Sequence, residues 1–239
     1  MSKFLTKFEA LHELARKNLW YYLFYLFCRG SLAFAFIAAG MVKILGERFA
    51  SGLSSLHPMG AYLEALHQTG YYYTFIGLAQ VLAALLLIIP RTVFIGALLY
   101  LPIIVNIWIL SFALRFEGSF VTSPLMVLAN LYILIWHYDR LKLLFSKKSP
   151  QSSRQPSKME RTFPIGFSLL VLAVVVFFAF MASIAYEVMP RNSLSDCHKQ
   201  FEGTEKESIG YTFCLCIHEN GLPLEQCLKA YEEMSLKEE

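Results

Sequence analysis

Two cations inside the first strongly apolar run constrain this chain more than any other feature. The run covers residues 20–46 and reads WYYLFYLFCRGSLAFAFIAAGMVKILG. A helix of this length exceeds the roughly 20 residues that cross the hydrocarbon layer of a bilayer, so Arg29 and Lys43 enter the membrane with it. Placing an arginine near the membrane centre costs about 2.5–3.5 kcal/mol. We therefore expect Arg29 to face a protein interior or a wet cavity.

The composition indicates a polytopic membrane protein. Of the 239 residues, 56% are hydrophobic and 16% are charged, whereas soluble domains carry about 25% charged residues. The first residues mix acids with bases, and the apolar run after them is too long for the core of a signal peptide, so we expect the first helix to be retained. The formal charge of +3 is distributed with the membrane and gives no sign of nucleic-acid binding. The lipid bilayer is the partner that the composition implies.

The apolar pattern predicts an all-α fold with a four-helix transmembrane bundle, a fifth transmembrane helix and a small disulfide-clipped helical tail. The expected spans are residues 20–46, 74–89, 93–114, 120–136 and 164–186. The expected domains are an amphipathic cytoplasmic N-terminus (1–19), the bundle (20–137), a basic cytoplasmic linker (138–162), the fifth helix (163–187) and an extracytoplasmic cysteine-containing tail (188–239). Pro58 also starts a helix in the loop after the first span.

The loops predict the orientation of the chain in a bacterial-type inner membrane. Residues 138–161 hold seven basic residues against Asp139 and Glu160, which is typical of a cytoplasmic loop. With five spans, the N-terminus is then cytoplasmic and the tail extracytoplasmic. The tail carries eleven acids against five bases from Glu187 onward, as expected for an exported segment. Lys43 and Arg48 are the exceptions to the charge rule.

Four of the five cysteines fall in the tail, which predicts disulfides on the exported side. They are Cys197, Cys214, Cys216 and Cys227. On a helix, Cys214 and Cys216 point about 200 degrees apart, so we expect each to bond a flanking cysteine rather than each other. Which of the two bonds Cys197 is left open, and a redox-active Cys-x-Cys pair is the alternative. Cys28, at membrane depth, is expected to be a small packing residue.

Polar residues within the spans predict a binding seam that opens outward. The candidate ligand-binding residues of this polar seam are Arg29, Lys43, Gln80, Asn106 and Asn130. Arg29, Phe36, Gly40 and Lys43 share one helical face, with Lys43 at the mouth of the seam and Arg29 at its floor. Such a pocket suits a quinone, a lipid headgroup or a small oxyanion. In the alternative interpretation, the amides join neighbouring helices, and Arg29 is capped by carbonyls or reaches toward the cytoplasmic headgroups.

Other constellations are weaker. His57, His67 and Glu64 share one loop but lack the fixed spacing of a metal site, so no metal ligands are assigned. His137 follows Trp136 at the cytoplasmic interface. No Cys-x-x-Cys, phosphate-binding glycine loop or paired haem histidine occurs in the sequence. We therefore assign no catalytic residue and no cofactor, other than the quinone that the seam suits, and whether the protein is an enzyme stays open.

Several short motifs resemble the DoxX-like integral membrane proteins over about residues 25–145. They are RGSLAFAFIAAGMVK at 29–43, AYLEAL at 61–66 with Gly70, IGLAQ at 76–80 and PRT at 90–92. The resemblance implies a four-helix membrane module, from a family named for a subunit of a thiosulfate:quinone oxidoreductase. The family commonly has a glutamate in its second span where this chain has Gln80, and the fifth span and the tail lie outside the four-span core.

Two functions follow from these observations. In the first, the protein is a non-catalytic membrane scaffold or accessory subunit whose exported tail docks a membrane or extracytoplasmic protein. In the second, it is the membrane subunit of a quinone-linked redox system, with Lys43 or Arg29 hydrogen-bonding a quinone carbonyl. The second requires an electron donor on another subunit, because no flavin, haem or iron–sulfur signature is visible. A small transporter is disfavoured, since the five spans show no internal repeat.

Overall fold

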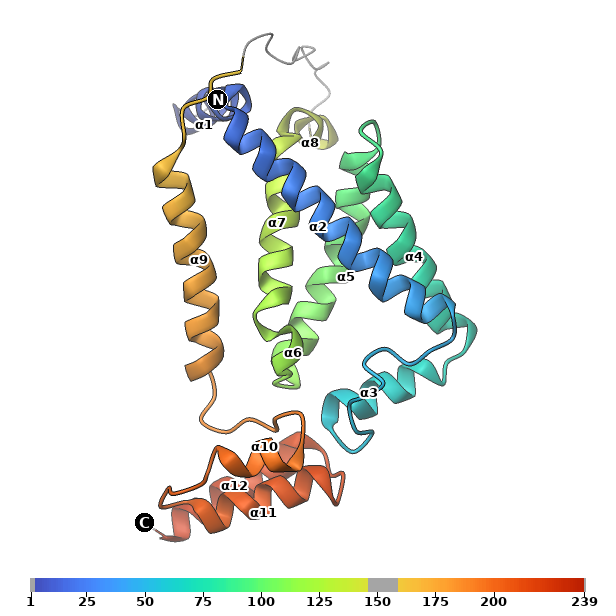
Figure 1. The fold of residues 1–239 in the computed structure, drawn as a ribbon, viewed down its shortest axis with the longest axis vertical. Coiled ribbons are helices and arrows are strands. Elements are labelled where there is room, and N and C mark those ends of the chain that lie inside the picture. The colour runs from blue at the N-terminus through green and yellow to red at the C-terminus, as the bar shows by residue number, and fades with distance from the viewer. Residues whose placement is uncertain (1–2, 146–158, 239) are drawn as a thin grey trace. The chain divides into compact units, whose positions relative to one another are not determined.

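The computed structural model describes residues 3–145 and 159–238 and confirms the all-α fold (Figure 1). Within these residues, five helices are long and apolar enough to cross a membrane. Four of them are α2 (Leu19–Ile44), α4 (Tyr71–Ile88), α5 (Val93–Ala113) and α9 (Ile165–Ile184). The remaining span, Glu117–Trp136, consists of the short α6 (Glu117–Phe120) and α7 (Thr122–Trp136). The protein is therefore a polytopic membrane protein.

The other helices lie before, between and after the spans. They are α1 (Lys3–Lys17), α3 (Pro58–His67), α8 (Tyr138–Phe145), α10 (Leu194–Lys199), α11 (Glu207–His218) and α12 (Leu224–Glu238). The second span begins three residues earlier than expected, because the tyrosines at 71–73 continue the helix. The linker expected at 138–162 opens with α8, and its lysines and arginines between 146 and 158 lie outside the described residues.

The described chain divides into two compact units, and each unit contains part of every span. Unit 1 comprises the residues up to Ala38, with Gln80–Ile104 and Leu125–Phe177. Unit 2 comprises Ala39–Ala79, Val105–Pro124 and the residues from Phe178 onward. The cysteine-containing tail thus belongs to the same unit as one end of each of the four spans of the bundle.

Unit 1 contains the packed core of the four-helix bundle. Phe36 of α2 stacks on Tyr100 of α5 with 3.5 Å between ring centroids. Tyr132 of α7 donates a hydrogen bond to the carbonyl oxygen of Tyr21 at 3.1 Å. Helix α9 joins this unit through Phe167, whose ring contacts those of Tyr21, Phe24 and Tyr132. No α9 residue is buried, as expected for a helix that faces lipid.

Close approach of two helices in unit 2 depends on a glycine. A Cβ atom added at Gly77 of α4 would lie 2.7 Å from the carbonyl oxygen of Gly40 and 2.8 Å from Cβ of Lys43. Only a residue without a side chain lets α2 and α4 pack at this distance, as small residues do in other membrane helix pairs. Arg48 orders the loop after α2 by donating to the carbonyl oxygen of Ser51 at 2.9 Å.

The tail of unit 2 has a hydrophobic core of its own, formed by α10, α11 and α12 (Figure 1). Cys197 and Cys214 form one disulfide, and Cys216 and Cys227 form the other. The expectation that each middle cysteine bonds a flanking one is confirmed, and the structure decides which partner each takes. A segment this short buries too little apolar surface to be stable alone, and the two crosslinks restrict its unfolded state.

Candidate functional site

Arg29, the expected floor of the seam, caps the end of a neighbouring helix in unit 1. Its Nε donates to the carbonyl oxygen of Leu87 at 2.8 Å, and its Nη2 donates to that of Ile88 at 2.6 Å. These carbonyls end α4, where the helix leaves its last acceptors unpaired and its dipole favours a cation. The guanidinium carbon also lies 5.6 Å from the ring centroid of Tyr25. This geometry matches the carbonyl-capped alternative for Arg29.

The two buried amides of the proposed seam both belong to unit 1. Gln80 of α4 is 2% exposed and Asn130 of α7 is fully buried. Asn130 donates through Nδ2 to the carbonyl oxygen of Ala97 on α5 at 3.0 Å, and therefore joins two helices. Its Oδ1 and the Oε1 of Gln80 are buried without a hydrogen-bond partner among the described residues. Each amide thus keeps one acceptor available.

Tyr100 adds a third buried polar group that sequence reasoning missed. Its hydroxyl is fully buried and has no partner within the described part of the chain. With a helical rise of about 1.5 Å per residue, Gln80, Tyr100 and Asn130 lie roughly 9–12 Å from the ends of their helices at Ile88, Val93 and Trp136. A hydrogen bond from Arg140 to the carbonyl oxygen of Arg91 places these ends on the same side of unit 1. The three groups therefore form a polar layer at one depth.

Lys43 is buried in unit 2 without a carboxylate partner among the described residues. It is 6% exposed, and its ammonium donates to the carbonyl oxygen of Ala39 at 3.0 Å. The ring centroids of Phe49 and Tyr73 lie 4.5 and 5.8 Å from Nζ. Cation–π contacts of this kind contribute about 0.5–2 kcal/mol, less than a full ionic partner supplies when the charge is desolvated.

The phenol of Tyr73 holds this environment in place. Its oxygen accepts from the backbone N–H of Phe49 at 2.8 Å and donates to the carbonyl oxygen of Glu47 at 3.0 Å. The loop after α2 is thereby fastened over Lys43. From the sequence, the tyrosines at 71–73 indicate a belt at the membrane interface. The hydrogen bonds of Tyr73 depend in addition on how the loop folds back.

The expected seam residues do not all share one environment. Arg29, Gln80 and Asn130 belong to unit 1, whereas Lys43 and Asn106 belong to unit 2. Asn106 is exposed on α5, so it is not a buried amide like Gln80 and Asn130. Helical periodicity carried no information on which face of α5 meets its neighbours.

The histidines and Glu64 between α2 and α4 contact the backbone or form an ion pair. His57 is 1% exposed, and its Nδ1 accepts the N–H of Met59 at 3.1 Å as the N-cap of α3. His67 contacts the carbonyl oxygen of Gly46 at 2.9 Å, and Glu64 pairs with Arg48 at 3.5 Å. Within the described ranges, no group of three potential metal ligands occurs.

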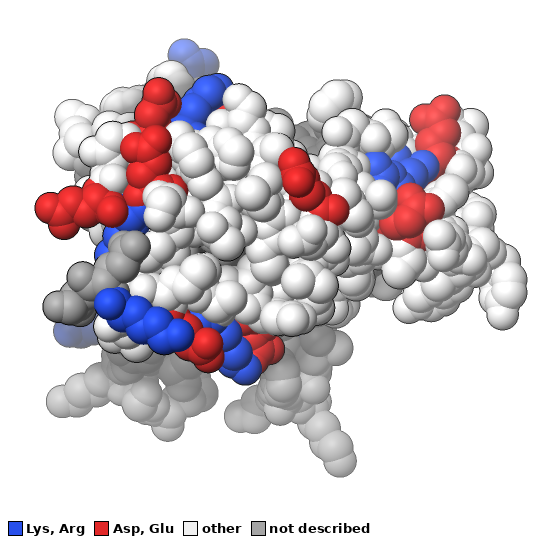
Figure 2. All heavy atoms as spheres, turned by 90° about the horizontal axis from the view of Figure 1, so that it is seen from below, with Lys and Arg blue, Asp and Glu red and all other residues white. Residues whose placement is uncertain are grey.

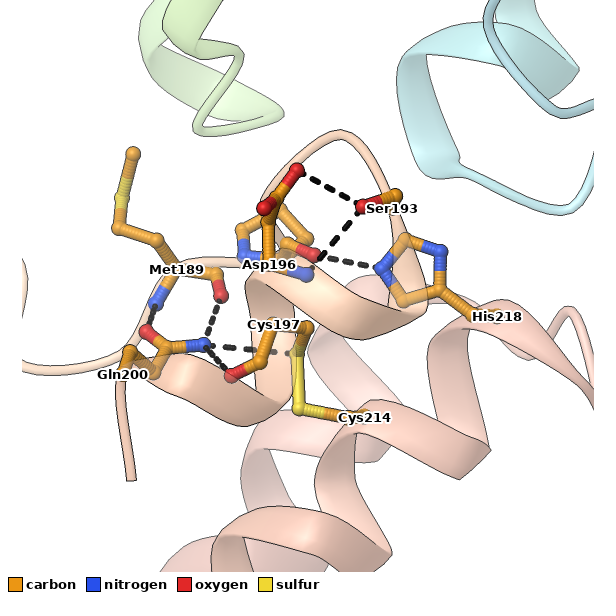
Figure 3. The surroundings of a disulfide bond; sticks show 8 residues. Met189, Ser193, Asp196, Cys197, Gln200, Cys214 and His218 are labelled. Atoms are coloured by element: carbon orange, nitrogen blue, oxygen red, sulfur yellow. Dashed lines mark hydrogen bonds between the residues drawn. A yellow bond between two sulfur atoms is a disulfide. The ribbon is translucent and has the colours of Figure 1, made fainter. Parts of the chain in front are cut away.

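The surroundings of the first disulfide explain how the start of the tail is held (Figure 3). The side-chain amide of Gln200 accepts from the backbone N–H of Met189 at 3.0 Å and donates to its carbonyl oxygen at 2.7 Å. Ser193 caps α10 by accepting from the N–H of Asp196. His218 of α11 donates to the carbonyl oxygen of Pro190 at 2.7 Å. All four tail cysteines are disulfide-bonded, whereas Cys28 is buried and free.

Comparison with known proteins yields one informative relative. "Uncharacterized protein YwoB" of Bacillus subtilis (strain 168) is 34% identical over 133 residues, which cover 53% of this chain and 84% of the relative. No protein-family model matches the chain, and no solved structure matches it. The matched length leaves nearly half of this chain without a counterpart in that relative.

Proposed function

We propose, from the premise that this chain belongs to the same family as the uncharacterized Bacillus subtilis protein YwoB, that it is a non-catalytic membrane scaffold or accessory subunit whose tail docks a partner. The observation that carries this proposal is the construction of the tail. Two disulfides and a hydrophobic core give helices α10, α11 and α12 a fixed surface, which is what a docking platform requires.

Contacts within unit 2 hold this platform against the loops that leave the spans. Arg191 forms an ion pair with Glu117, and Arg115 donates to the carbonyl oxygen of Val188 at 2.5 Å. Gly221 lies against Leu56 so closely that an added Cβ would come within 2.7 Å of its side chain. A partner that binds the tail would therefore be held at the membrane surface.

The charge of the tail favours a basic partner. Its eleven acids and five bases leave an excess of six negative charges. Four of the five bases already form ion pairs, Arg191 with Glu117, Lys199 with Asp196, Lys206 with Glu187 and Lys229 with Glu225. Acidic side chains are visible at several separate places on the face shown in Figure 2. The acidic tail and the basic linker support an extracytoplasmic tail and a cytoplasmic N-terminus in a bacterial-type inner membrane.

The resemblance to DoxX-like proteins supports the role of the bundle as an anchor. The motifs at residues 29–43 and 76–80 lie in α2 and α4, the helices whose close approach depends on Gly77. Arg29 contributes to the bundle itself, because it caps the end of α4. In the scaffold proposal, Arg29 therefore has a structural role.

Photo-crosslinking in intact cells tests the scaffold proposal. A benzoylphenylalanine placed at Glu219 or Glu232, which are exposed on the tail, should give a discrete adduct with another protein. The same probe at Arg91, exposed in the turn between α4 and α5, should not give that adduct. With the probe at Glu219, the double substitution Glu232→Lys and Glu233→Lys should weaken the adduct, because charge complementarity steers association. The absence of any tail-specific adduct would reject the proposal.

The environment of Lys43 favours a second candidate, a quinone-binding membrane subunit. A buried ammonium that has two aromatic rings beside it and no carboxylate among the described residues can donate to a quinone carbonyl. Quinone extracted from the purified protein should then be stoichiometric in the wild type and lost in Lys43→Ala. Wild-type protein purified without quinone would exclude this candidate. Arg29→Ala should leave the bound quinone in place, because Arg29 caps the end of α4.

A further inference from the structure

A groove of about 810 Å³ in unit 2 lies outside the seam and outside the acidic surface of the tail. Its walls come from the last turns of α5, the residues just after α5 and the start of α12. Its lining includes Trp108, Ile109, Phe112, Arg115, Tyr186 and Leu228. This volume is within the range of about 300–1,000 Å³ that is typical of small-molecule sites.

The groove lies at one end of a membrane span. Trp108, Ile109 and Phe112 belong to the last turns of the span that ends at Ala113. Arg115 follows that end by two residues, and Leu228 belongs to the tail helix α12. Ile109 is 62% exposed, so this side of the groove is open where the helix borders the acyl chains of the bilayer. An occupant must therefore have an apolar part and a polar part.

The groove contains the hydrogen-bond donors Trp108 and Arg115, and one carboxylate, Glu225. The indole Nε1 of Trp108 is buried without a partner in the described residues. Arg115 has five N–H groups, and its Nη1 donates to Val188 while its guanidinium carbon lies 4.1 Å from the ring centroid of Tyr186. Glu225, the acidic residue of the groove, pairs with Lys229 at 2.9 Å. The groove thus offers donors and a positive charge to an acceptor.

The backbone and the electrostatics of Arg115 support a specific role for this side chain. Its φ of 49° lies in the left-handed region, which costs a residue other than glycine about 1 kcal/mol or more. Burial lowers the pKa of Arg115, because the charged form is partly removed from water. An anion bound beside the guanidinium would offset this loss of hydration.

We propose that this groove binds an anionic phospholipid of the bilayer. The phosphodiester accepts hydrogen bonds from the guanidinium of Arg115, and an ester carbonyl of the lipid accepts from Nε1 of Trp108. One acyl chain lies along Ile109 and Phe112 toward the hydrocarbon layer. A free phosphate would leave the apolar walls without a contact. The proposal concerns lipid recognition and does not rest on the scaffold function.

Quenching of tryptophan fluorescence by brominated lipid tests the proposal in the full-length protein. The chain has three tryptophans, at 20, 108 and 136, so Trp20→Phe with Trp136→Phe leaves Trp108 as the reporter. Vesicles of phosphatidylcholine that contain increasing fractions of brominated phosphatidylglycerol are compared with vesicles that contain brominated phosphatidylcholine. We expect half-maximal quenching at a severalfold lower fraction of the anionic lipid. Equal quenching by both lipids would mean ordinary annular contact and would overturn the proposal.

A matched pair of variants identifies the cation. In the same background, Arg115→Gln should remove the preference for phosphatidylglycerol, whereas Arg91→Gln removes an equal charge from an exposed turn and should keep the preference. The loss corresponds to about tenfold in affinity, the value of one charge-assisted hydrogen bond. A preference that persists in Arg115→Gln, or that disappears in Arg91→Gln, contradicts the proposed site.

Native mass spectrometry provides a measurement that needs no tryptophan substitution. Wild-type protein in detergent, titrated with phosphatidylglycerol, should retain one lipid at concentrations where phosphatidylcholine, ubiquinone and inorganic phosphate are not retained. Trp108→Phe keeps an aromatic ring and removes the pyrrole part of the indole with its N–H donor, so it should weaken retention severalfold with both disulfides intact. Retention of ubiquinone in preference to phosphatidylglycerol, or unchanged retention in Trp108→Phe, would reject the lipid assignment.

Discussion

The imidazole rings of His57 and His218 lie 6.0 Å apart between their centroids in unit 2. His57 is the buried N-cap of α3, and His218 ends α11, where it donates to the carbonyl oxygen of Pro190. Burial, together with the nearby His218, lowers the pKa of His57 to about 4. Protonation of His57 therefore weakens the contact between the tail and the loop that precedes α3.

This contact predicts a loss of stability in acid. The folded-state pKa of about 4 lies below the ordinary value of 6.5, so the unfolded chain binds more protons between these values. The contribution of neutral His57 is complete above pH 6.5 and decreases as the pH falls toward 4, by up to about 1.4 kcal/mol per pH unit. Thermal unfolding of the purified protein between pH 7.5 and pH 5 measures this decrease.

His57→Asn separates this titration from the capping role. Asparagine is a favourable N-cap residue and carries no titrating group, so the variant should fold and show a flatter pH dependence. His67→Asn changes a histidine that contacts a carbonyl of the same loop and should keep the wild-type slope. An unchanged slope in His57→Asn would assign the titration to another group.

Loss of the first disulfide should destabilise the tail strongly. Cys197→Ser with Cys214→Ser opens a crosslink between residues separated by 17 positions, and such losses cost about 2–5 kcal/mol in small domains. Proteolysis of the tail in detergent, monitored by gel, should become many times faster. Cys28→Ala, which changes a free buried cysteine of unit 1, is the control. Equal protease resistance of all three proteins would show that the helices hold without the bond.

Two glycine substitutions test the close approach of α2 and α4. Gly77→Ala places a Cβ within 3 Å of the backbone of Gly40, which should destabilise the protein by about 1–3 kcal/mol. Gly30→Ala adds the same methyl group on α2 where nothing lies within 4 Å, and should be neutral or stabilising by up to about 1 kcal/mol. Melting temperatures of the two variants in one detergent should therefore move in different directions. Equal shifts would contradict the close packing.

The two membrane cations should respond oppositely to methionine. Lys43→Met keeps the apolar stem beside Phe49 and removes a desolvated charge, so we expect unchanged or higher stability. Arg29→Met leaves the carbonyls of Leu87 and Ile88 without their donor and should cost about 2 kcal/mol or more. Thermal unfolding of each single variant, in which the other cation is intact, measures both changes in stability. A loss of stability in Lys43→Met would show that the charge of Lys43 also stabilises the fold.

Periodic and compositional features were predictable from the sequence. Membrane helices form because apolar runs of sufficient length satisfy their own backbone groups in lipid, and α5 starts at the expected Val93 and ends within one residue of the expected end. The geometry of one helix also favoured bonds from Cys214 and Cys216 to flanking cysteines, as the structure has them. The break between α6 and α7 was not predicted, although Thr122, Ser123 and Pro124 interrupt the apolar run directly after it.

Contacts between distant segments depended on the tertiary structure. The sequence does not distinguish an Arg29 that faces a ligand from one that caps a helix end. Only the folded chain places the carbonyls of Leu87 and Ile88 within reach of its donors. The exposure of Asn106 likewise depends on which face of α5 meets its neighbours. The groove at Arg115 had no signal in the sequence, because its two walls are separated by more than a hundred residues along the chain.

The sequence by itself determined that this protein is an all-α membrane protein with five spans and a disulfide-clipped tail, since these properties follow from local length, hydropathy and cysteine spacing. The tertiary structure alone decided that Arg29 caps α4, that Lys43 lies between aromatic rings, and that Trp108 and Arg115 border one groove. The physical reason is that a buried charge is stabilised by atoms within a few ångströms, and folding selects those atoms from segments that the order of residues does not bring together.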